Sequence, residues 1–218
     1  MNNHPWKSAR YLRSIAGPGR IVPVEIGHDL DFEDQPSCRP SEDLLYLAQH
    51  DLTKQFPTLR EDIIVPDYVY ASLCSDDSPR YRPPNNDDQI IFNTWLGPKD
   101  AMSPAHTDPY YNCYVQVVGY KSVWLAPPLV TASMYPFTPG ISDGLPNERL
   151  PSSEIGNTSQ VDVFASANDL KQYPTFVQQV APTAMTAVLA PGDLLFFPPG
   201  WWHAMRSEMT SLSFSIWF

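Results

Sequence analysis

Three potential metal ligands lie in two short segments of the sequence. His106 and Asp108 are separated by one residue in Ser103-Pro104-Ala105-His106-Thr107-Asp108, and His203 ends the stretch that begins at Pro191-Gly192-Asp193. On an extended strand, residues i and i+2 point to the same side, so this imidazole and carboxylate converge. Two histidines and one carboxylate that leave other positions open are the ligand set of non-haem Fe(II) oxygenases. The pattern predicts an iron site.

The same residues also have a structural interpretation. His-x-Asp pairs are common by chance, and Asp108 could be a turn residue because Pro109 follows it. Both histidines could be hydrogen-bonded core residues. The chain has only 5 histidines, and the second candidate closes a strand and turn after Pro-Gly-Asp, which favours the metal site. Spacing alone leaves both interpretations open.

An iron oxygenase of this kind also needs a co-substrate that supplies two electrons, such as 2-oxoglutarate. Its distal carboxylate requires a cation beside the metal. Lys121 follows the largely apolar run Val117-Val118-Gly119-Tyr120. If the lysine is buried, a bound carboxylate would be a suitable partner. Alternatively, Lys121 lies at a hairpin turn beside Gly119 with its ammonium in water.

The segments that must position these residues are predicted to be mainly β-strands. Strand-like stretches bounded by turn residues cover 90–97, 111–118, 122–126, 186–190, 194–198 and 211–217. Before them, a short helix around 6–15, an apolar strand over 21–26 and one or two helical turns over 52–63 are expected. Residues 127–180 form a long insertion, which often serves as a lid or substrate-facing surface. The pattern favours a double-sheet β-barrel with helices on its outside and N-terminal side.

Composition supports one domain and excludes several classes of partner. The 218 residues include 24 prolines, about twice the usual ~5%, which favours short strands joined by rigid turns. The net charge of −10 argues against direct binding to nucleic acid. No apolar run approaches the ~18–20 residues of a membrane span. The 3 cysteines form no CxxC motif, so we expect a reducing intracellular compartment, nucleus and/or cytoplasm. The oligomeric state is not indicated.

Seven stretches of sequence together carry a resemblance to a known family. They are Val22–Gly27, Tyr46–His50, Ile64–Tyr68, Asn93–Pro98, Ser103–Pro109, Asn157–Val163 and Leu189–His203. In this order they cover nearly the whole chain, which resembles the jumonji-C (JmjC, cupin-like) 2-oxoglutarate oxygenases, closest to their arginyl-hydroxylase-type branch. The resemblance implies a double-stranded β-helix (jelly-roll) barrel. Residues 1–218 would form one catalytic domain, in which 1–89 pack on a barrel core of 90–218, with no long N-terminal extension.

The resemblance also implies a role for each matching residue. Fe(II) would be bound by His106, Asp108 and His203. The distal carboxylate of 2-oxoglutarate would be held by Lys121 and Tyr46. Further contacts with this co-substrate would come from Ser103 and Asn112 through hydrogen bonds and from Trp95 through packing.

Two further residues are candidates for substrate binding. Glu25 lies where the arginyl-hydroxylase branch places a carboxylate that faces the substrate guanidinium, a pairing that bidentate hydrogen bonds stabilise. Alternatively, Glu25 is an exposed strand residue. Gln49 is a candidate because it is close to Tyr46 in sequence. The segment after Gly27 is shorter than the family pattern, so this wall of the pocket is expected to be remodelled or open.

The expected activity is that of an Fe(II)- and 2-oxoglutarate-dependent dioxygenase that uses O2 to hydroxylate a C–H bond. The favoured substrate is a protein side chain such as arginine. Three alternatives remain: hydroxylation of a small molecule, histone lysine demethylation, and a non-catalytic cupin-like binding module.

Overall fold

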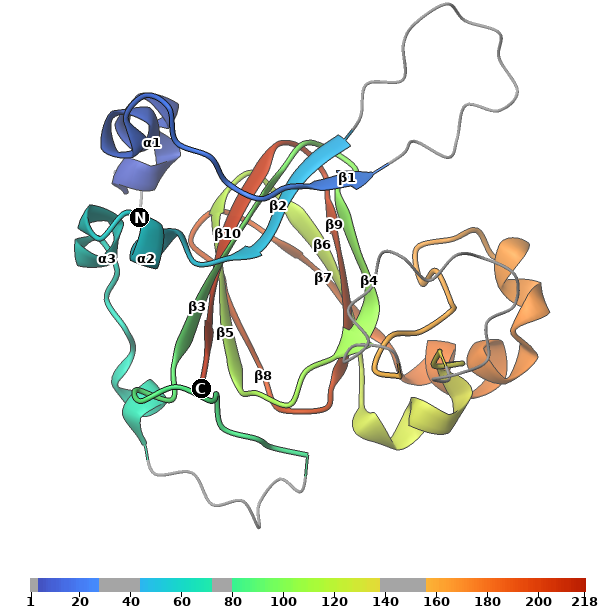
Figure 1. The fold of residues 1–218 in the computed structure, drawn as a ribbon. Coiled ribbons are helices and arrows are strands. Elements are labelled where there is room, and N and C mark those ends of the chain that lie inside the picture. Colours follow the sequence, from blue (N-terminus) through green and yellow to red (C-terminus); the bar gives the residue numbers. More distant parts are fainter. Residues whose placement is uncertain (1–3, 28–43, 72–79, 138–155) are drawn as a thin grey trace, which may run out of the picture.

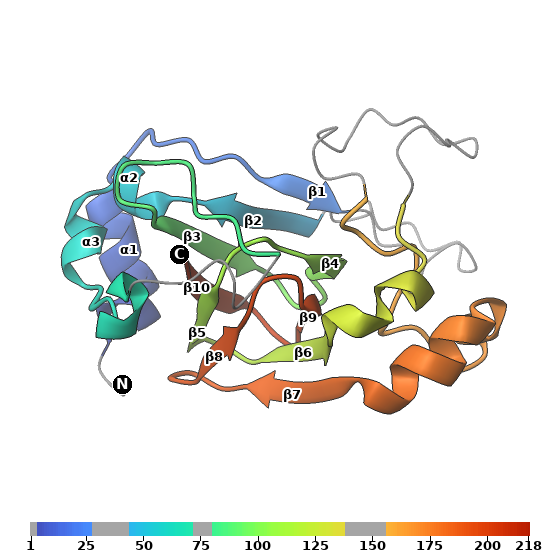
Figure 2. The same cartoon turned by 90° about the horizontal axis from the view of Figure 1, so that it is seen from below.

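Two antiparallel sheets face each other and form a barrel (Figure 1). In the computed structural model, residues 4–27, 44–71, 80–137 and 156–218 are described. The larger sheet has six strands in the order β1-β2-β3-β10-β5-β8, and the smaller has four in the order β4-β9-β6-β7. Figure 2 shows β1, β2 and β3 in one layer and β6 and β7 in the opposite layer. This arrangement confirms the predicted mainly β, jelly-roll fold class.

The strands are short, as the proline content predicts. Their bounds are β1 Glu25–Gly27, β2 Leu44–His50, β3 Ile91–Gly97, β4 Met102–Thr107, β5 Asn112–Val118, β6 Lys121–Ala126, β7 Met185–Leu189, β8 Leu194–Phe197, β9 Trp202–Ser207 and β10 Ser211–Trp217. Six of them correspond to the strand-like stretches read from the later part of the sequence. The strands β2, β4 and β9 were not among the predictions, and β9 has few of the β-branched residues that mark strands in its sequence WHAMRS. The strand expected over 21–26 was wrong for its first part, because β1 begins only at Glu25.

Three short helices cover the outer face of the larger sheet (Figure 1). They are α1 Ala9–Ala16, α2 Leu52–Gln55 and α3 Thr58–Glu61. Trp6, Phe56 and Leu59 are buried there against Phe214 and Ile216 of β10. Apolar packing on this face therefore fixes β10 and β3, which also form the inner wall of the barrel.

The described part of the insertion covers the outer face of the smaller sheet at β4, β6 and β9. Its helical segments are the 3-10 turns Pro128–Ser133 and Asp169–Gln172 and the π-helical turn Phe176–Val180, and the 3-10 turn Ala181–Thr183 follows it. Phe176 and Val180 pack against Trp124 and Trp202 in a second buried cluster. Elsewhere in the chain, before the insertion, Pro5–Lys7 and Asp67–Tyr70 form two more 3-10 turns. Among the described residues, no helix has the length and apolar character needed to cross a membrane.

The strand β10 places a polar face inside the barrel. Leu212, Phe214 and Ile216 point outward to the helix-covered cluster. Because side chains alternate along a strand, Ser213 and Ser215 point inward. Both are fully buried. The interior of the barrel therefore combines this polar wall with an apolar cluster that includes Val123, Leu189 and Met205.

Candidate active site

The smaller sheet brings the three potential metal ligands together. His106 of β4 and His203 of β9 are direct cross-strand neighbours, and Asp108 comes one residue after β4 ends. The backbone N–H of Gly200, in the turn before β9, donates to the carbonyl oxygen of Asp108 at 2.8 Å. Gly200 has a φ of +76°, which favours glycine, so this turn can join the two ligand-bearing segments.

Both imidazoles point their Nε2 atoms toward the carboxylate of Asp108. Nε2 of His203 lies 3.5 Å and Nε2 of His106 lies 3.9 Å from Oδ2 of Asp108. Each Nδ1 faces a backbone carbonyl, that of Pro104 at 2.8 Å and that of Trp201 at 3.1 Å. Carbonyls only accept, so each Nδ1 donates its proton to the backbone, and each Nε2 is the ring nitrogen left to face Asp108 and a metal.

This donor set fits a metal cation. Asp108 Oδ2 is buried and accepts no hydrogen bond from the described residues. One ligand atom from each of the three residues lies within 4.8 Å of the others. Burial lowers the pKa of His106, and the neighbouring His203 lowers it further, which favours the neutral imidazole that a metal requires. Three converging acceptors without a donor call for a cation between them.

Lys121 is buried in the barrel beside two phenols. Its Nζ donates to Oη of Tyr114 at 3.1 Å and to Oη of Tyr46 at 3.3 Å, and its side chain is only 1% exposed. The alternative in which the ammonium lies in water is therefore wrong. Burial lowers the pKa of Lys121 to about 7 and raises that of Tyr46 to about 12. In the described part of the chain, no carboxylate forms an ion pair with this ammonium.

The other co-substrate candidates lie around Tyr46. Ser103 Oγ is 3.4 Å from the Tyr46 hydroxyl, and the ring of Trp95 has its centroid 6.3 Å from that of Tyr46. The indole N–H of Trp95 donates to Ser215 Oγ at 3.2 Å. Asn112 is buried, and its Oδ1 has no hydrogen-bond partner among the described residues. All the residues proposed for the co-substrate thus face the same interior.

A cavity of about 650 Å³ opens over this site. Six of the ten sequence-predicted site residues line it: Glu25, Gln49, Trp95, Ser103, His106 and Asp108. The other four, Tyr46, Asn112, Lys121 and His203, are each at most 6% exposed. The buried four belong to the interior of the barrel, while the six form the access to it.

Glu25 and Gln49 lie at the mouth of the cavity. Glu25 begins β1 and pairs with Tyr46 of β2. Gln49 has a φ of +51° where the register of β2 shifts against β3, a bulge that changes which way a side chain points. Both side chains are exposed. The structure thus brings both substrate candidates to the cavity, although Glu25 is also the exposed strand residue of the alternative interpretation.

The insertion supplies the wall next to His106. Thr158 forms a β-bridge with His106, and Ser159 N donates to Ala105 O at 2.8 Å. Asn157 accepts from Thr107 N at 2.9 Å and donates through Nδ2 to Thr107 O at 2.8 Å. Residues 157–164 line the cavity, so this part of the insertion faces whatever binds there.

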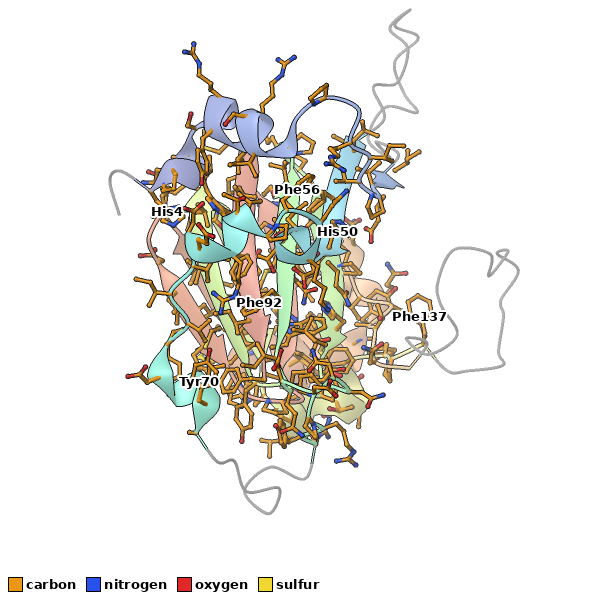
Figure 3. The ribbon with its side chains drawn as sticks, turned by 60° about the vertical axis from the view of Figure 1, so that its left-hand side comes forward. His4, His50, Phe56, Tyr70, Phe92 and Phe137 are labelled. Carbon is orange, nitrogen blue, oxygen red and sulfur yellow. The ribbon has the colours of Figure 1, made fainter. Side chains whose placement is uncertain are left out.

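Sequence reasoning missed Tyr114, Asn93 and Trp217. Tyr114 contacts Lys121, Trp217 lines the cavity, and Asn93 is a buried residue with an unpaired Nδ2. The available signal was alternation, because Tyr114 lies two residues after Asn112 on the same face of β5. In contrast, Nε2 of His50 hydrogen-bonds Oε1 of Gln55, the last residue of α2, at 3.0 Å, and His50 (labelled in Figure 3) is not among the residues that line the cavity.

Comparisons with known proteins agree with this architecture. The cupin-like domain family matches residues 24–218. Jumonji C domain-containing protein 5 of Drosophila melanogaster is 34% identical over 99% of this chain and 51% of its own length. Lysine-specific demethylase 8 of Danio rerio is 37% identical over 99% of this chain and 49% of its own length. Lysine-specific demethylase JMJ30 of Arabidopsis thaliana is 30% identical over 98% of this chain and 46% of its own length.

The chain spans about half the length of these curated relatives. The family match covers the strands of both sheets, the His-Asp-His group and Lys121. The chain therefore belongs to the cupin-like domain family, as one of its JmjC members.

Proposed function

We propose that this protein is an Fe(II)- and 2-oxoglutarate-dependent dioxygenase that hydroxylates a C–H bond. The observation that carries the proposal is Lys121, a buried cation in the same barrel as His106, Asp108 and His203. Its partners in the described chain are two phenols that burial keeps neutral. A buried ammonium without a counter-ion is costly, and the carboxylate of a ligand would remove that cost.

Each part of the chain has a defined task in this proposal. His106, Asp108 and His203 would hold the metal. Iron(II) would supply the activation of O2, with 2-oxoglutarate as the two-electron donor that leaves as succinate and CO2, so that one oxygen atom of O2 enters succinate and the other enters the substrate. Lys121 and the Tyr46 hydroxyl fix the distal carboxylate, while Ser103 and Asn112 orient the co-substrate. The cavity wall at 157–164 limits access of water to the metal.

The favoured substrate is an arginine side chain in a protein. Glu25 and Gln49 at the mouth of the cavity offer oxygen acceptors to a guanidinium group. The aromatic rings of Phe137 and Tyr110 line the same cavity and favour a cation over their faces. A peptide would reach the metal from the open side, so its backbone would lie across the cavity wall formed by the insertion.

Lysine demethylation is the second candidate, because two of the relatives reported above carry the name lysine-specific demethylase. The same site would hydroxylate an N-methyl group, which is then lost as formaldehyde. Incubation with arginine peptides and with methyl-lysine peptides, followed by mass spectrometry, therefore distinguishes arginine hydroxylation from lysine demethylation. Gain of one oxygen atom on arginine supports the hydroxylase, and loss of a methyl group supports the demethylase. A metabolite panel tests the small-molecule alternative in the same assay.

The proposal is tested by titrating 2-oxoglutarate into the protein loaded with Mn²⁺, which does not support turnover. The wild-type protein should bind 2-oxoglutarate only with the metal present, and Lys121→Met should weaken binding by about tenfold or more, as expected for a lost hydrogen bond to a charged group. Binding that depends on neither the metal nor Lys121 would contradict the proposal and favour a non-catalytic binding module.

A further inference from the structure

The strand β7 is an open edge of the smaller sheet. It comes last in the order β4-β9-β6-β7, and in the described part of the chain β6 is its only neighbour. Figure 2 shows β7 along the margin of the molecule. Its residues from Met185 to Val188 are all exposed. Among the described residues, the backbone N–H and C=O groups on its outer side therefore meet no further strand, and such an edge readily pairs with another chain.

The other three edges of the two sheets are protected against such pairing. The strand β4, at the opposite edge of the same sheet, contains Pro104, has a register shift against β9 and is bridged by Thr158. The strand β1 has 3 residues and begins with the charged Glu25, and Pro198 and Pro199 follow β8 directly. Proline, bulges, charge and short length all keep edges unpaired. The strand β7 has none of these features, because it reads MTAVL and pairs with β6 at every residue.

The described part of the insertion covers the outer face of the smaller sheet but not β7. The buried cluster there includes Ala105 of β4, Trp124 of β6 and Trp202 of β9, and β7 contributes no residue to it. Thr186 is the direct neighbour of Trp124, so Thr186 and Val188 lie on this same outer face. Val188 is nevertheless 60% exposed. Both the edge and the outer face of β7 are thus accessible to a partner.

The segment that contains β7 has no charged side chain. No acidic or basic residue occurs between Lys171 and Asp193 in a chain whose net charge is −10. The carboxylate of Asp193 itself accepts a hydrogen bond from the backbone N–H of Ala190 at 2.8 Å, in the turn that follows β7. A basic partner would find no carboxylate on β7 to bind. A second copy carries the same −10, so it can approach closely only at an uncharged surface, which β7 provides on both copies.

We propose that β7 pairs antiparallel with β7 of a second copy of this chain across a two-fold axis, which joins the two smaller sheets into one continuous sheet. Across such an axis the same strand meets itself in the opposite direction, so the backbone donors of each copy face the acceptors of the other. The uncharged side chains of Thr186 and Val188 then meet their counterparts on the shared outer face. This dimer does not depend on the proposed oxygenase activity.

Sedimentation equilibrium of the full chain tests the proposal. At about 100 μM, where even a dimer with a Kd of ~10 μM is mostly formed, the wild type should have twice the chain mass of 24.6 kDa. Thr186→Lys/Val188→Lys places lysines opposite lysines across the axis and should have the mass of one chain. Ile21→Lys/Val24→Lys is the matched control, because it adds the same two charges at exposed residues just before β1, in the layer opposite β7 (Figure 2). It should remain a dimer.

Hydrogen exchange of the wild type tests the same interface without a variant. Backbone amides of 185–189 should exchange several-fold more slowly at about 100 μM than at about 1 μM, whereas those of the inner strand β9 should not depend on concentration. A wild type with the mass of one chain, or exchange in β7 that is independent of concentration, would overturn the inference. A dimer that persists in Thr186→Lys/Val188→Lys, or that is lost equally in the control, would place the interface elsewhere and overturn it as well.

Discussion

Nζ of Lys121 lies 3.3 Å from the hydroxyl of Tyr46, a residue 75 positions earlier in the sequence. The two residues come from opposite sheets, since Tyr46 lies on β2 and Lys121 begins β6. Their contact joins the two sheets across the interior of the barrel. It creates a buried cation with neutral neighbours, which is the feature from which most of the following predictions derive.

Binding of 2-oxoglutarate should take up a proton at alkaline pH. Burial lowers the pKa of Lys121 to about 7, and the facing Tyr46 and Tyr114 hydroxyls stay neutral because their pKa values are raised. A bound carboxylate favours the ammonium form, so the lysine gains a proton on binding above pH ~7 and is already protonated at pH ~6. Calorimetry of the metal-loaded protein in buffers of different ionisation enthalpy should detect close to one proton at pH ~8.5 and close to none at pH ~6.

The matched control is Lys121→Arg, because a guanidinium stays charged throughout this range. It should bind 2-oxoglutarate without proton uptake at either pH. Equal uptake at both pH values in the wild type would show that Lys121 does not face the carboxylate.

The ligand-free protein should become more stable as the pH rises from about 7 to about 10. Across this window the folded Lys121 has lost its proton while the unfolded chain, with a lysine pKa of about 10.4, retains it. The unfolded state then binds more protons, so the unfolding free energy increases with pH. Lys121→Met removes this dependence and should stabilise the ligand-free protein most at or below pH ~7. Denaturant unfolding at three pH values measures the difference in unfolding free energy between Lys121→Met and the wild type. A difference that stays the same at all three pH values would contradict the buried location of the ammonium.

Gly97→Ala should impair the co-substrate site through Tyr46. A Cβ at Gly97 would lie 2.6 Å from Cδ2 of Tyr46 and 2.7 Å from Cβ of Ala101, so the ring of Tyr46 must shift from its position beside Lys121. We expect a several-fold rise in the KM for 2-oxoglutarate and a loss of about 1–3 kcal/mol in stability, as for other overpacked sites.

Gly17→Ala is the control that separates the loss of stability from the rise in the KM for 2-oxoglutarate. Its φ of +66° makes alanine unfavourable, but nothing lies within 4 Å of the added Cβ and the site is remote. It should lower stability with an unchanged KM. A Gly97→Ala protein that loses stability only would show that Tyr46 does not contact the co-substrate.

Metal binding should stabilise the wild-type protein but not His106→Ala. A ligand present at 100 times its dissociation constant adds about 2.7 kcal/mol to the unfolding free energy, so Mn²⁺ should raise the Tm by several degrees. His50→Ala is the control, since His50 bonds Gln55 and lies outside the His-Asp-His group. It should keep the full shift. The same shift in His106→Ala would place the metal elsewhere.

The metal ligands and the polar residues inside the barrel differ in how well a sequence predicts them. His106 and Asp108 could be selected from the sequence, because an i, i+2 pair on an extended segment points to the same side whatever the rest of the fold is. Lys121 could be selected by its apolar context, but its burial depends on the closing of two sheets, and only resemblance to a family associated it with Tyr46.

The inner wall of β10 was missed for a physical reason. Alternation of Leu212, Phe214 and Ile216 with Ser213 and Ser215 is typical of a strand that has one face in water. Here helices cover the apolar face, and the serines face an enclosed barrel, so both faces are buried. Trp217, on the inward face, therefore could not be assigned to the site from periodicity.

The central claim is tested most directly by the conversion of 2-oxoglutarate to succinate in the presence of Fe(II), O2 and an arginine peptide. The wild-type protein should form succinate together with hydroxylated peptide, His50→Ala should do the same, and His106→Ala should form neither. Full turnover by His106→Ala, or no succinate from an iron-loaded wild type that binds 2-oxoglutarate and the peptide, would contradict the assignment of this barrel as an oxygenase.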